Sequence, residues 1–148
     1  ETPDTQVATF HFEGRRTITW QGLSCSRRPE AAGPRADVVF SGDDGSLAIS
    51  GSGYKVFDPS GKELRGEGGD GGDAAHTDNF IAAIREGVPL SSGIDEAHTS
   101  TLICHLGNIA QRVGRSLRCD PADGRILEDA EAMKHWKREY EPGWEPAL

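Results

Sequence analysis

Residues Gly66–Asp73 have the sequence GEGGDGGD, and the hydrophobic pattern of the chain differs on the two sides of this segment. Before it, apolar residues alternate with polar ones, which is the period of a β-strand. After it, apolar residues recur every three or four positions, as in an amphipathic helix. Strands followed by helices are typical of an α+β domain, with helices packed on one face of an antiparallel β-sheet. We therefore predict one α+β domain over residues 1–148, with no Rossmann domain in this chain.

The predicted domain has three parts: a β meander over residues 1–65, a glycine-rich linker over 66–73, and a mainly helical part over 74–148. In the meander, residues 7–12 and 16–20 alternate around Glu13-Gly14-Arg15, which predicts a hairpin. Turn sequences rich in Asp, Ser, Pro and Gly separate the further strands that we predict, at 36–40, 47–50, 54–57 and 62–65.

The two faces of the predicted hairpin differ in composition. One face points toward the core and carries Ala8, Phe10, Phe12, Ile18 and Trp20. The opposite face is β-prone and has no formal charge when histidine is neutral, since it carries Val7, Thr9, His11, Thr17 and Thr19. Such a face suits a flat contact between sheets, or it is an ordinary solvent-exposed face rich in threonine.

Three helices are predicted after the linker, at about 73–86, 95–113 and 128–139. Asp73 is expected to cap the first helix, and Gly87 to end it. Gly107 lies inside the second helix, where glycine costs about 1 kcal/mol relative to alanine, so we expect another part of the backbone to approach closely there. We expect the core to contain ten apolar residues: Phe10, Phe12, Ile18, Trp20, Phe40, Phe80, Ile84, Leu102, Leu106 and Ile109.

The composition excludes several classes of protein. The net charge of −8 and a pI of about 5.1 disfavour nucleic acid as a partner. The apolar runs are too short to span a membrane. No signal peptide is predicted at Glu1–Asp4, and the compartment stays open between the cytoplasm and an exported protein. Cys25, Cys104 and Cys119 are odd in number and widely spaced, which favours reduced thiols.

The segment 66–73 has two alternative functional interpretations beside that of a plain linker. A glycine-rich turn before a helix can cradle phosphate, but Glu67, Asp70 and Asp73 would repel it and the lysine of a P-loop is absent. Half of a calcium-binding nonapeptide repeat is also present, but such sites need stacked copies. His98 and His105 lack the spacing of a metal site, and no nucleophile–base pair is evident.

His76, Asp78 and Asn79 lie at the start of the first predicted helix. Polar side chains at a helix N-terminus can face a cleft, where the helix dipole favours anions or oxygen atoms. The alternative, which we weight more heavily, is local capping and hydrogen bonding to the preceding loop.

Three segments carry a family resemblance. The first has the pattern H-x-x-N-F-x-x-x-I-R at His76–Arg85, and the second is His98–Arg112, which contains His105-Leu106-Gly107-Asn108-Ile109-Ala110. The third is Asp120-Pro121, followed by the tail around Trp136–Tyr140. Together they resemble the C-terminal region of a bacterial subgroup of the Gfo/Idh/MocA oxidoreductases. The resemblance covers nearly the whole chain.

The resemblance implies a C-terminal substrate-cleft and oligomerisation domain whose parent is an NAD(P)-dependent oxidoreductase acting on a sugar or polyol derivative. NAD or NADP would bind an N-terminal Rossmann domain outside this chain, so no catalytic, cofactor-binding or metal residue is assigned here. His76, Asn79 and His98 are the substrate-facing candidates, and a homo-oligomer, most simply a dimer through the sheet face, is expected. Two alternatives stay open, a stand-alone binding or assembly module without a cofactor and a domain of an NAD-using glycosidase relative.

Overall fold

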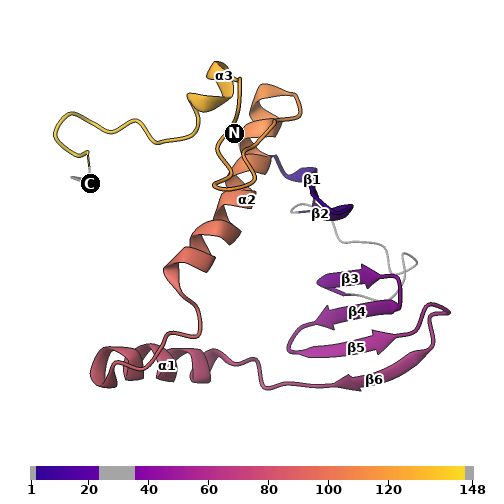
Figure 1. Cartoon of the computed structure of the whole chain (residues 1–148). Helices are drawn as coiled ribbons and strands as arrows, with labels where there is room; N and C mark the ends of the chain where they lie inside the picture. The colour runs from indigo at the N-terminus through magenta and orange to yellow at the C-terminus, as the bar shows by residue number, and fades with distance from the viewer. Residues whose placement is uncertain (1–2, 24–35, 146–148) are drawn as a thin grey trace. The chain divides into compact units, whose positions relative to one another are not determined.

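The computed structural model describes residues 3–23 and 36–145, and it divides into two compact units (Figure 1). Unit 1 combines Glu1–Arg27 with Gly93–Leu148, and unit 2 is Arg28–Ser92. The described strands pair antiparallel throughout and are followed by three helices. The α+β prediction is therefore confirmed. The described strands form a two-stranded sheet in unit 1 and a four-stranded sheet in unit 2.

The first sheet is the predicted hairpin, formed by β1 (Thr5–Phe12) and β2 (Arg16–Leu23). Phe12 pairs with Arg16, so Glu13-Gly14-Arg15 is the connecting loop, as expected. Gly14 and Arg15 are both left-handed, with φ of 71° and 60°. Glycine adopts this conformation freely, whereas arginine does so at some cost. The hairpin prediction is confirmed, with both strands longer than the sequence pattern indicated.

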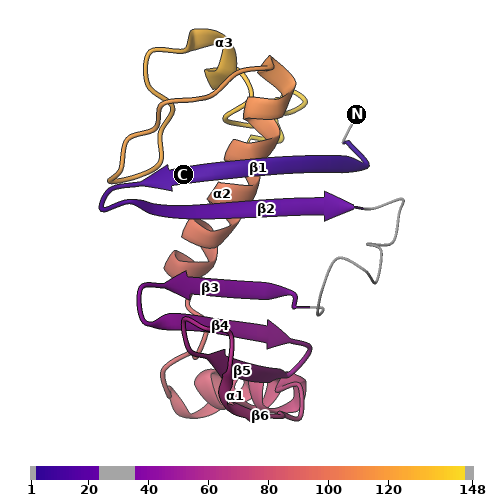
Figure 2. The same ribbon diagram turned by 90° about the vertical axis from the view of Figure 1, so that its right-hand side faces the viewer.

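Helix α2 (Ile94–Val113) crosses behind the hairpin of unit 1 (Figure 2). A Cβ atom placed on Gly107 would lie 3.2 Å from Phe10 Cζ and 3.5 Å from Ala8 Cβ. The side-chain amide of Gln6 also donates to the Gly107 carbonyl at 3.2 Å. Gly107 is thus a point of close approach, but side chains of β1 fill the space that the sequence analysis assigned to a backbone.

The third helix is much shorter than the predicted 128–139, because α3 covers only Ala130–Met133. Glu128 has a φ of 55°, which an α-helix excludes, so the helix cannot begin there. Asp129 is the N-cap, and its carboxylate accepts the amide of Ala132. The apolar spacing of Met133, Trp136 and Tyr140 suggested a longer helix, but the helical hydrogen bonding does not continue to Tyr140.

The second sheet has the order β3–β4–β5–β6 and is the meander of unit 2. Its strands are β3 (Val38–Gly42), β4 (Gly45–Ser50), β5 (Gly53–Phe57) and β6 (Glu63–Glu67). All four predicted strands of this region are present, with ends shifted by at most two residues. Because β6 runs to Glu67, the glycine-rich connection to the next helix is shorter than the predicted 66–73.

Helix α1 (Asp73–Glu86) has the predicted length and ends at Gly87, which is left-handed with a φ of 72°. Its N-terminus differs from the prediction, because Gly72 is the N-cap and no side chain caps the helix. Asp73 lies in the first turn instead, where its negative charge interacts favourably with the helix dipole.

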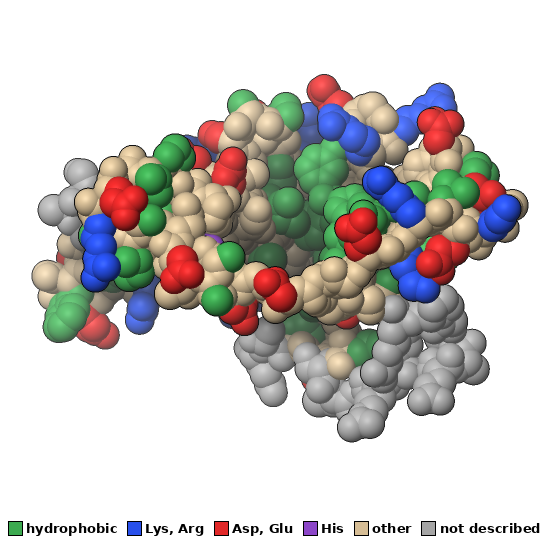
Figure 3. Space-filling view, turned by 90° about the horizontal axis from the view of Figure 1, so that it is seen from below, with side chains coloured by type: hydrophobic (Ala, Val, Ile, Leu, Met, Phe, Trp, Pro, Cys, Tyr) green, Lys and Arg blue, Asp and Glu red, His purple; other side chains and the backbone are tan. Residues whose placement is uncertain are grey.

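The predicted core is mostly wrong. Of the ten residues, only Ile109 is buried, and Phe10, Leu102 and Leu106 are half-buried. Ile109 packs with Ile126 and Ala132, two residues that the prediction omitted. The other six are exposed: Phe12, Ile18, Trp20, Phe40, Phe80 and Ile84. Figure 3 shows hydrophobic side chains at the surface among the charged ones. Burial alternates in β1, where Ala8 and Phe10 are half-buried, but it does not alternate in β2, where Ile18 and Trp20 are exposed like their neighbours.

Candidate functional site

The three substrate-facing candidates are divided between the two units. His76 and Asn79 are on α1 in unit 2, three positions apart and therefore on one face of that helix. His98 is on α2 in unit 1. All three are half-exposed or exposed.

Asn79 holds the loop that follows α1. Its Nδ2 atom donates to the Pro89 carbonyl at 3.0 Å, and its Oδ1 atom accepts the Ser91 amide at 2.8 Å and the Ser91 hydroxyl at 3.0 Å. Because Pro89 prevents regular helical hydrogen bonding in this loop, the Asn79 side chain supplies hydrogen-bond partners for the loop backbone instead. The sequence indicated bonding to the loop that precedes the helix, whereas Asn79 binds the loop that follows it, which begins about two helical turns later at Gly87.

His76 lies in the first turn of α1, where its backbone amide donates to the Gly72 carbonyl at 2.9 Å. Its imidazole is exposed. Because the side chain is one turn from the N-terminus, it is in position to donate to or accept from a polar group arriving at this end of the helix. His76 thus keeps the placement that the sequence indicated.

His98 lines a shallow surface hollow on the first turns of α2, together with Ile94, Asp95, Ala97 and Thr101. Ile94 is 78% exposed, so the hollow has an apolar rim beside an imidazole and a carboxylate. A mixed surface of this kind can contact the polar and apolar faces of a small molecule, but it needs a further wall to enclose one.

The glycine-rich connection uses its own carboxylate as a hydrogen-bond acceptor. Asp70 Oδ1 accepts the Gly72 amide at 3.1 Å, and Gly71 and Gly72 are both left-handed. A phosphate cradle needs such an amide to be free, and the Asp70 charge would also repel phosphate. This geometry favours the plain linker over the nucleotide-binding interpretation.

The described cysteines and acidic side chains form no evident metal site. Within residues 3–23 and 36–145, no group of three or more His, Cys, Asp or Glu side chains could hold a metal ion. Cys104 is free and exposed, and Cys119 is free and half-buried. Burial raises the pKa of the Cys119 thiol, which makes it less reactive. Cys25 lies outside the described residues.

An ion cluster that the sequence analysis missed joins the end of α2 to α3. Arg115 makes two parallel hydrogen bonds to Asp129, at 2.9 and 2.8 Å, and a third to Glu131 at 2.8 Å. The bonds from Arg115, together with the Ala132 amide, lower the pKa of Asp129, and the same pairing raises the pKa of Arg115. Because Asp129 also caps α3 through the Ala132 amide, the Arg115 ion pairs help to hold Ala132 against Ile109 and Ile126.

We expect the stability of unit 1 to decrease on acidification as Asp129 becomes protonated. Its folded pKa is below the ordinary 3.8, so its contribution is present above that value and is lost as the pH falls through the folded pKa. Asp129→Asn should lower the unfolding midpoint in urea at about pH 7, and the difference from wild type should decrease as the pH falls below 3.8 and through the folded pKa.

Glu128→Gln is the matched control for this prediction. The Arg118–Glu128 pair is highly exposed, at 78% and 80%, so its loss should change the midpoint little. Equal effects of the two variants would contradict the role assigned to Asp129.

No family model, curated protein or solved structure matches this chain. Within the described residues, no helix is both long enough and apolar enough to cross a membrane.

Proposed function

We propose that this chain is the C-terminal substrate-cleft and oligomerisation domain of an NAD(P)-dependent oxidoreductase of the Gfo/Idh/MocA type, acting on a sugar or polyol derivative. In this proposal the cofactor binds a Rossmann domain outside the chain, and the acid–base residues of the reaction also belong to another part of the parent protein. The glycine-rich connection does not fit a nucleotide, since Asp70 occupies the Gly72 amide. The chain's own contribution is to line the substrate cleft and to bring copies together.

The observation that carries the proposal is the packing of the Leu106-Gly107-Asn108-Ile109-Ala110 segment, the most specific part of the resemblance. Gly107 admits the side chains of Phe10 and Ala8 against α2, and Ile109 is buried in the cluster with Ile126 and Ala132. Leu106, Gly107 and Ile109 of this segment thus each have a packing role. This supports the arrangement that the resemblance implies, with helices packed on one face of an antiparallel sheet.

Homo-oligomerisation forms part of the proposal, through the outer face of the hairpin. The β1–β2 register places Val7 opposite Gln21, Thr9 opposite Thr19 and His11 opposite Thr17. These six side chains point away from the Ala8–Phe10 side that packs on α2, and all are exposed. A flat β face without carboxylates offers a second copy of an acidic chain a surface free of like-charge repulsion.

We expect the isolated chain not to bind NADH. Titrating NADH at constant chain concentration and following nicotinamide fluorescence should show no saturable change, because the described strands pair only antiparallel and form no parallel βαβ unit of the kind that binds dinucleotides. Saturable binding at micromolar NADH would contradict the assignment of the cofactor to another domain.

The proposed cleft role is tested in the full-length protein that contains this chain. His76→Ala and His98→Ala should each reduce kcat/KM for the sugar or polyol about two- to tenfold, the cost of one hydrogen bond, chiefly through KM. His135→Ala, an exposed histidine beyond α3, is the control and should have no effect. Unchanged kinetics in both variants would remove these histidines from the cleft.

A further inference from the structure

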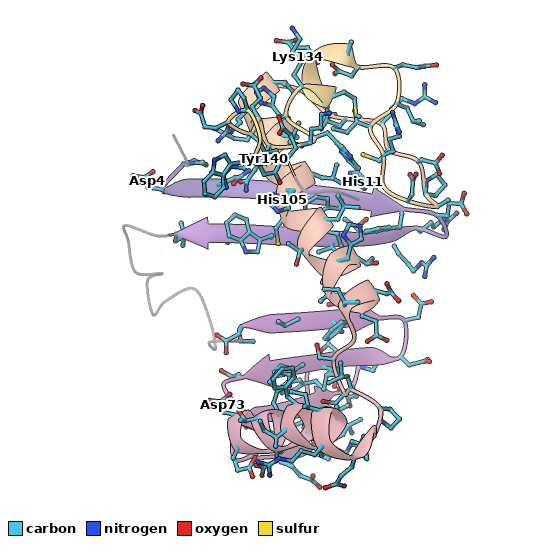
Figure 4. All side chains as sticks on the ribbon, turned by 90° about the vertical axis from the view of Figure 1, so that its left-hand side faces the viewer. Asp4, His11, Asp73, His105, Lys134 and Tyr140 are labelled. Atoms are coloured by element: carbon cyan, nitrogen blue, oxygen red, sulfur yellow. The ribbon has the colours of Figure 1, made fainter. Side chains whose placement is uncertain are left out.

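The two edges of the four-stranded sheet in unit 2 differ in how well they are protected against pairing with another strand. Strands β3 and β6 are the outer strands of this sheet (Figure 1). The chain leaves the sheet at β6 and continues into α1 at Asp73 (Figure 4). An edge strand presents a row of unpaired backbone amides and carbonyls, and proteins commonly protect it with charges, prolines or bulges. The distribution of these features indicates which edge is open to a partner.

Strand β6 is the protected edge. Its five residues, Glu63–Glu67, include two glutamates and one arginine. Glu63 also pairs with Lys55 of the neighbouring strand at 2.7 Å. The ladder between β5 and β6 has a register shift at Val56/Phe57. A charged and irregular edge of this kind disfavours the addition of a further strand.

Strand β3 has none of these protective features. Its sequence, VVFSG over Val38–Gly42, has no charged residue and no proline, and its pairing with β4 has no register shift. Every residue of the strand is exposed. Among the described residues, no strand pairs with β3 on the side away from β4. An apolar, uncharged edge of this kind is a template for strand addition.

The carboxylates nearest to β3 lie at its ends. Asp37 Oδ2 accepts the Gly51 amide at 2.7 Å, and the Asp37 amide donates to the Ile49 carbonyl at 2.8 Å, so this residue is held toward β4 and the turn that follows it. Asp43 and Asp44 lie in the turn between β3 and β4. Copies of a chain with a net charge of −8 repel each other, and they approach at least cost along an edge that carries no charge.

We propose that β3 pairs antiparallel with β3 of a second copy of this chain, across a two-fold axis at Val39. Residues directly opposite each other in an antiparallel pair have their side chains on the same face of the sheet. An axis at Val39 sets Val38 opposite Phe40 of the second copy, and the symmetry repeats this contact. Aromatic and β-branched residues in opposite positions stabilise a sheet. The same register sets Asp37 opposite Ser41 of the second copy, so no two carboxylates are opposite each other.

The pairing joins the four-stranded sheets of two copies into one continuous sheet. A two-fold axis makes the contact self-complementary, because each β3 supplies the partner that the other lacks. This association uses a strand edge in unit 2. It is therefore independent of the association through the hairpin of unit 1 that forms part of the proposed function.

Hydrogen exchange of the β3 amides, measured in the whole chain over a range of chain concentrations, tests the pairing locally. Amides of β3 that do not bond to β4 should exchange about tenfold more slowly at concentrations well above the Kd of the pair than well below it. Exchange in β1 and β2 reports any association through the hairpin separately. Exchange in β3 that does not depend on concentration overturns the proposal.

Val39→Lys should abolish this concentration dependence, because it places two like charges opposite each other at the two-fold axis. Leu64→Lys on β6 is the matched control and should leave the dependence unchanged. Val39 and Leu64 are 55% and 60% exposed, so neither change should unfold the sheet. Loss of the dependence in both variants, or in neither, overturns the assignment to the β3 edge.

Val39→Cys tests the register. Opposite Cα atoms in an antiparallel pair are about 4.5–5.5 Å apart, which is within the reach of a disulfide. Mild oxidation should therefore link the two introduced cysteines, as mass spectrometry of the proteolytic peptides would show. Leu64→Cys should give no corresponding link. If no link forms at position 39 although β3 is protected at high concentration, the two-fold pairing at Val39 is overturned.

Discussion

Ile109→Ala should lower the free energy of unfolding of unit 1 by about 2–5 kcal/mol, because it removes a side chain from the only buried apolar cluster that the described residues form. Ile109 is 5% exposed and packs with Ile126 and Ala132. With so few buried side chains, the surroundings have little other apolar contact to replace those that are lost. Urea unfolding followed by hydrogen exchange of the α2 amides measures the loss in this unit directly.

Ile94→Ala is the matched control, since it makes the same change on the same helix. Ile94 is 78% exposed, so its truncation should cost less than about 0.5 kcal/mol. If the two variants lost similar stability, the buried cluster would not be the main source of stability in unit 1. A loss for Leu106→Ala between those of the two isoleucine variants is also expected, because Leu106 is half-buried against the cluster.

Gly107→Val should detach the hairpin from α2 and cost about 1–3 kcal/mol, as overpacking does. A Cβ atom at this position already lies 3.2 Å from Phe10 Cζ, and the two further methyl groups of valine have no space. The bond from the Gln6 side-chain amide to the Gly107 carbonyl should be lost with the contact. Faster hydrogen exchange in β1 and β2, with the α2 amides still protected, is the expected signature.

Gly107→Ala separates crowding from helix propensity. Alanine gains about 1 kcal/mol of propensity over glycine, and its single methyl group requires Phe10 to move by only a few tenths of an ångström. We therefore expect nearly unchanged stability for this variant. Destabilisation of Gly107→Ala as large as that of Gly107→Val would show that the space around Gly107 is more rigid than the Phe10 ring allows.

The candidate site was only partly accessible from the sequence. The positions of His76 and Asn79 on one helix follow from the periodicity of residues 73–86, and the structure confirms that helix. The contacts of Asn79 with Pro89 and Ser91 require the loop to fold back toward the helix. The Arg115–Asp129 pair joins residues 14 positions apart, a separation at which no local pattern indicates contact.

The sequence by itself determined the elements whose signal is local. Alternation determined the hairpin and its two faces, the three- to four-residue period determined α1 and α2, and Gly87 determined the end of α1, because each depends on a few neighbouring residues. Tertiary structure alone decided which apolar residues are buried. Ile126 and Ala132 carry no periodic signal, yet the turn around Cys119–Ile126 and the cap at Asp129 bring them onto Ile109. Burial depends on which surfaces meet, and that is a property of distant segments rather than of the pattern within one segment.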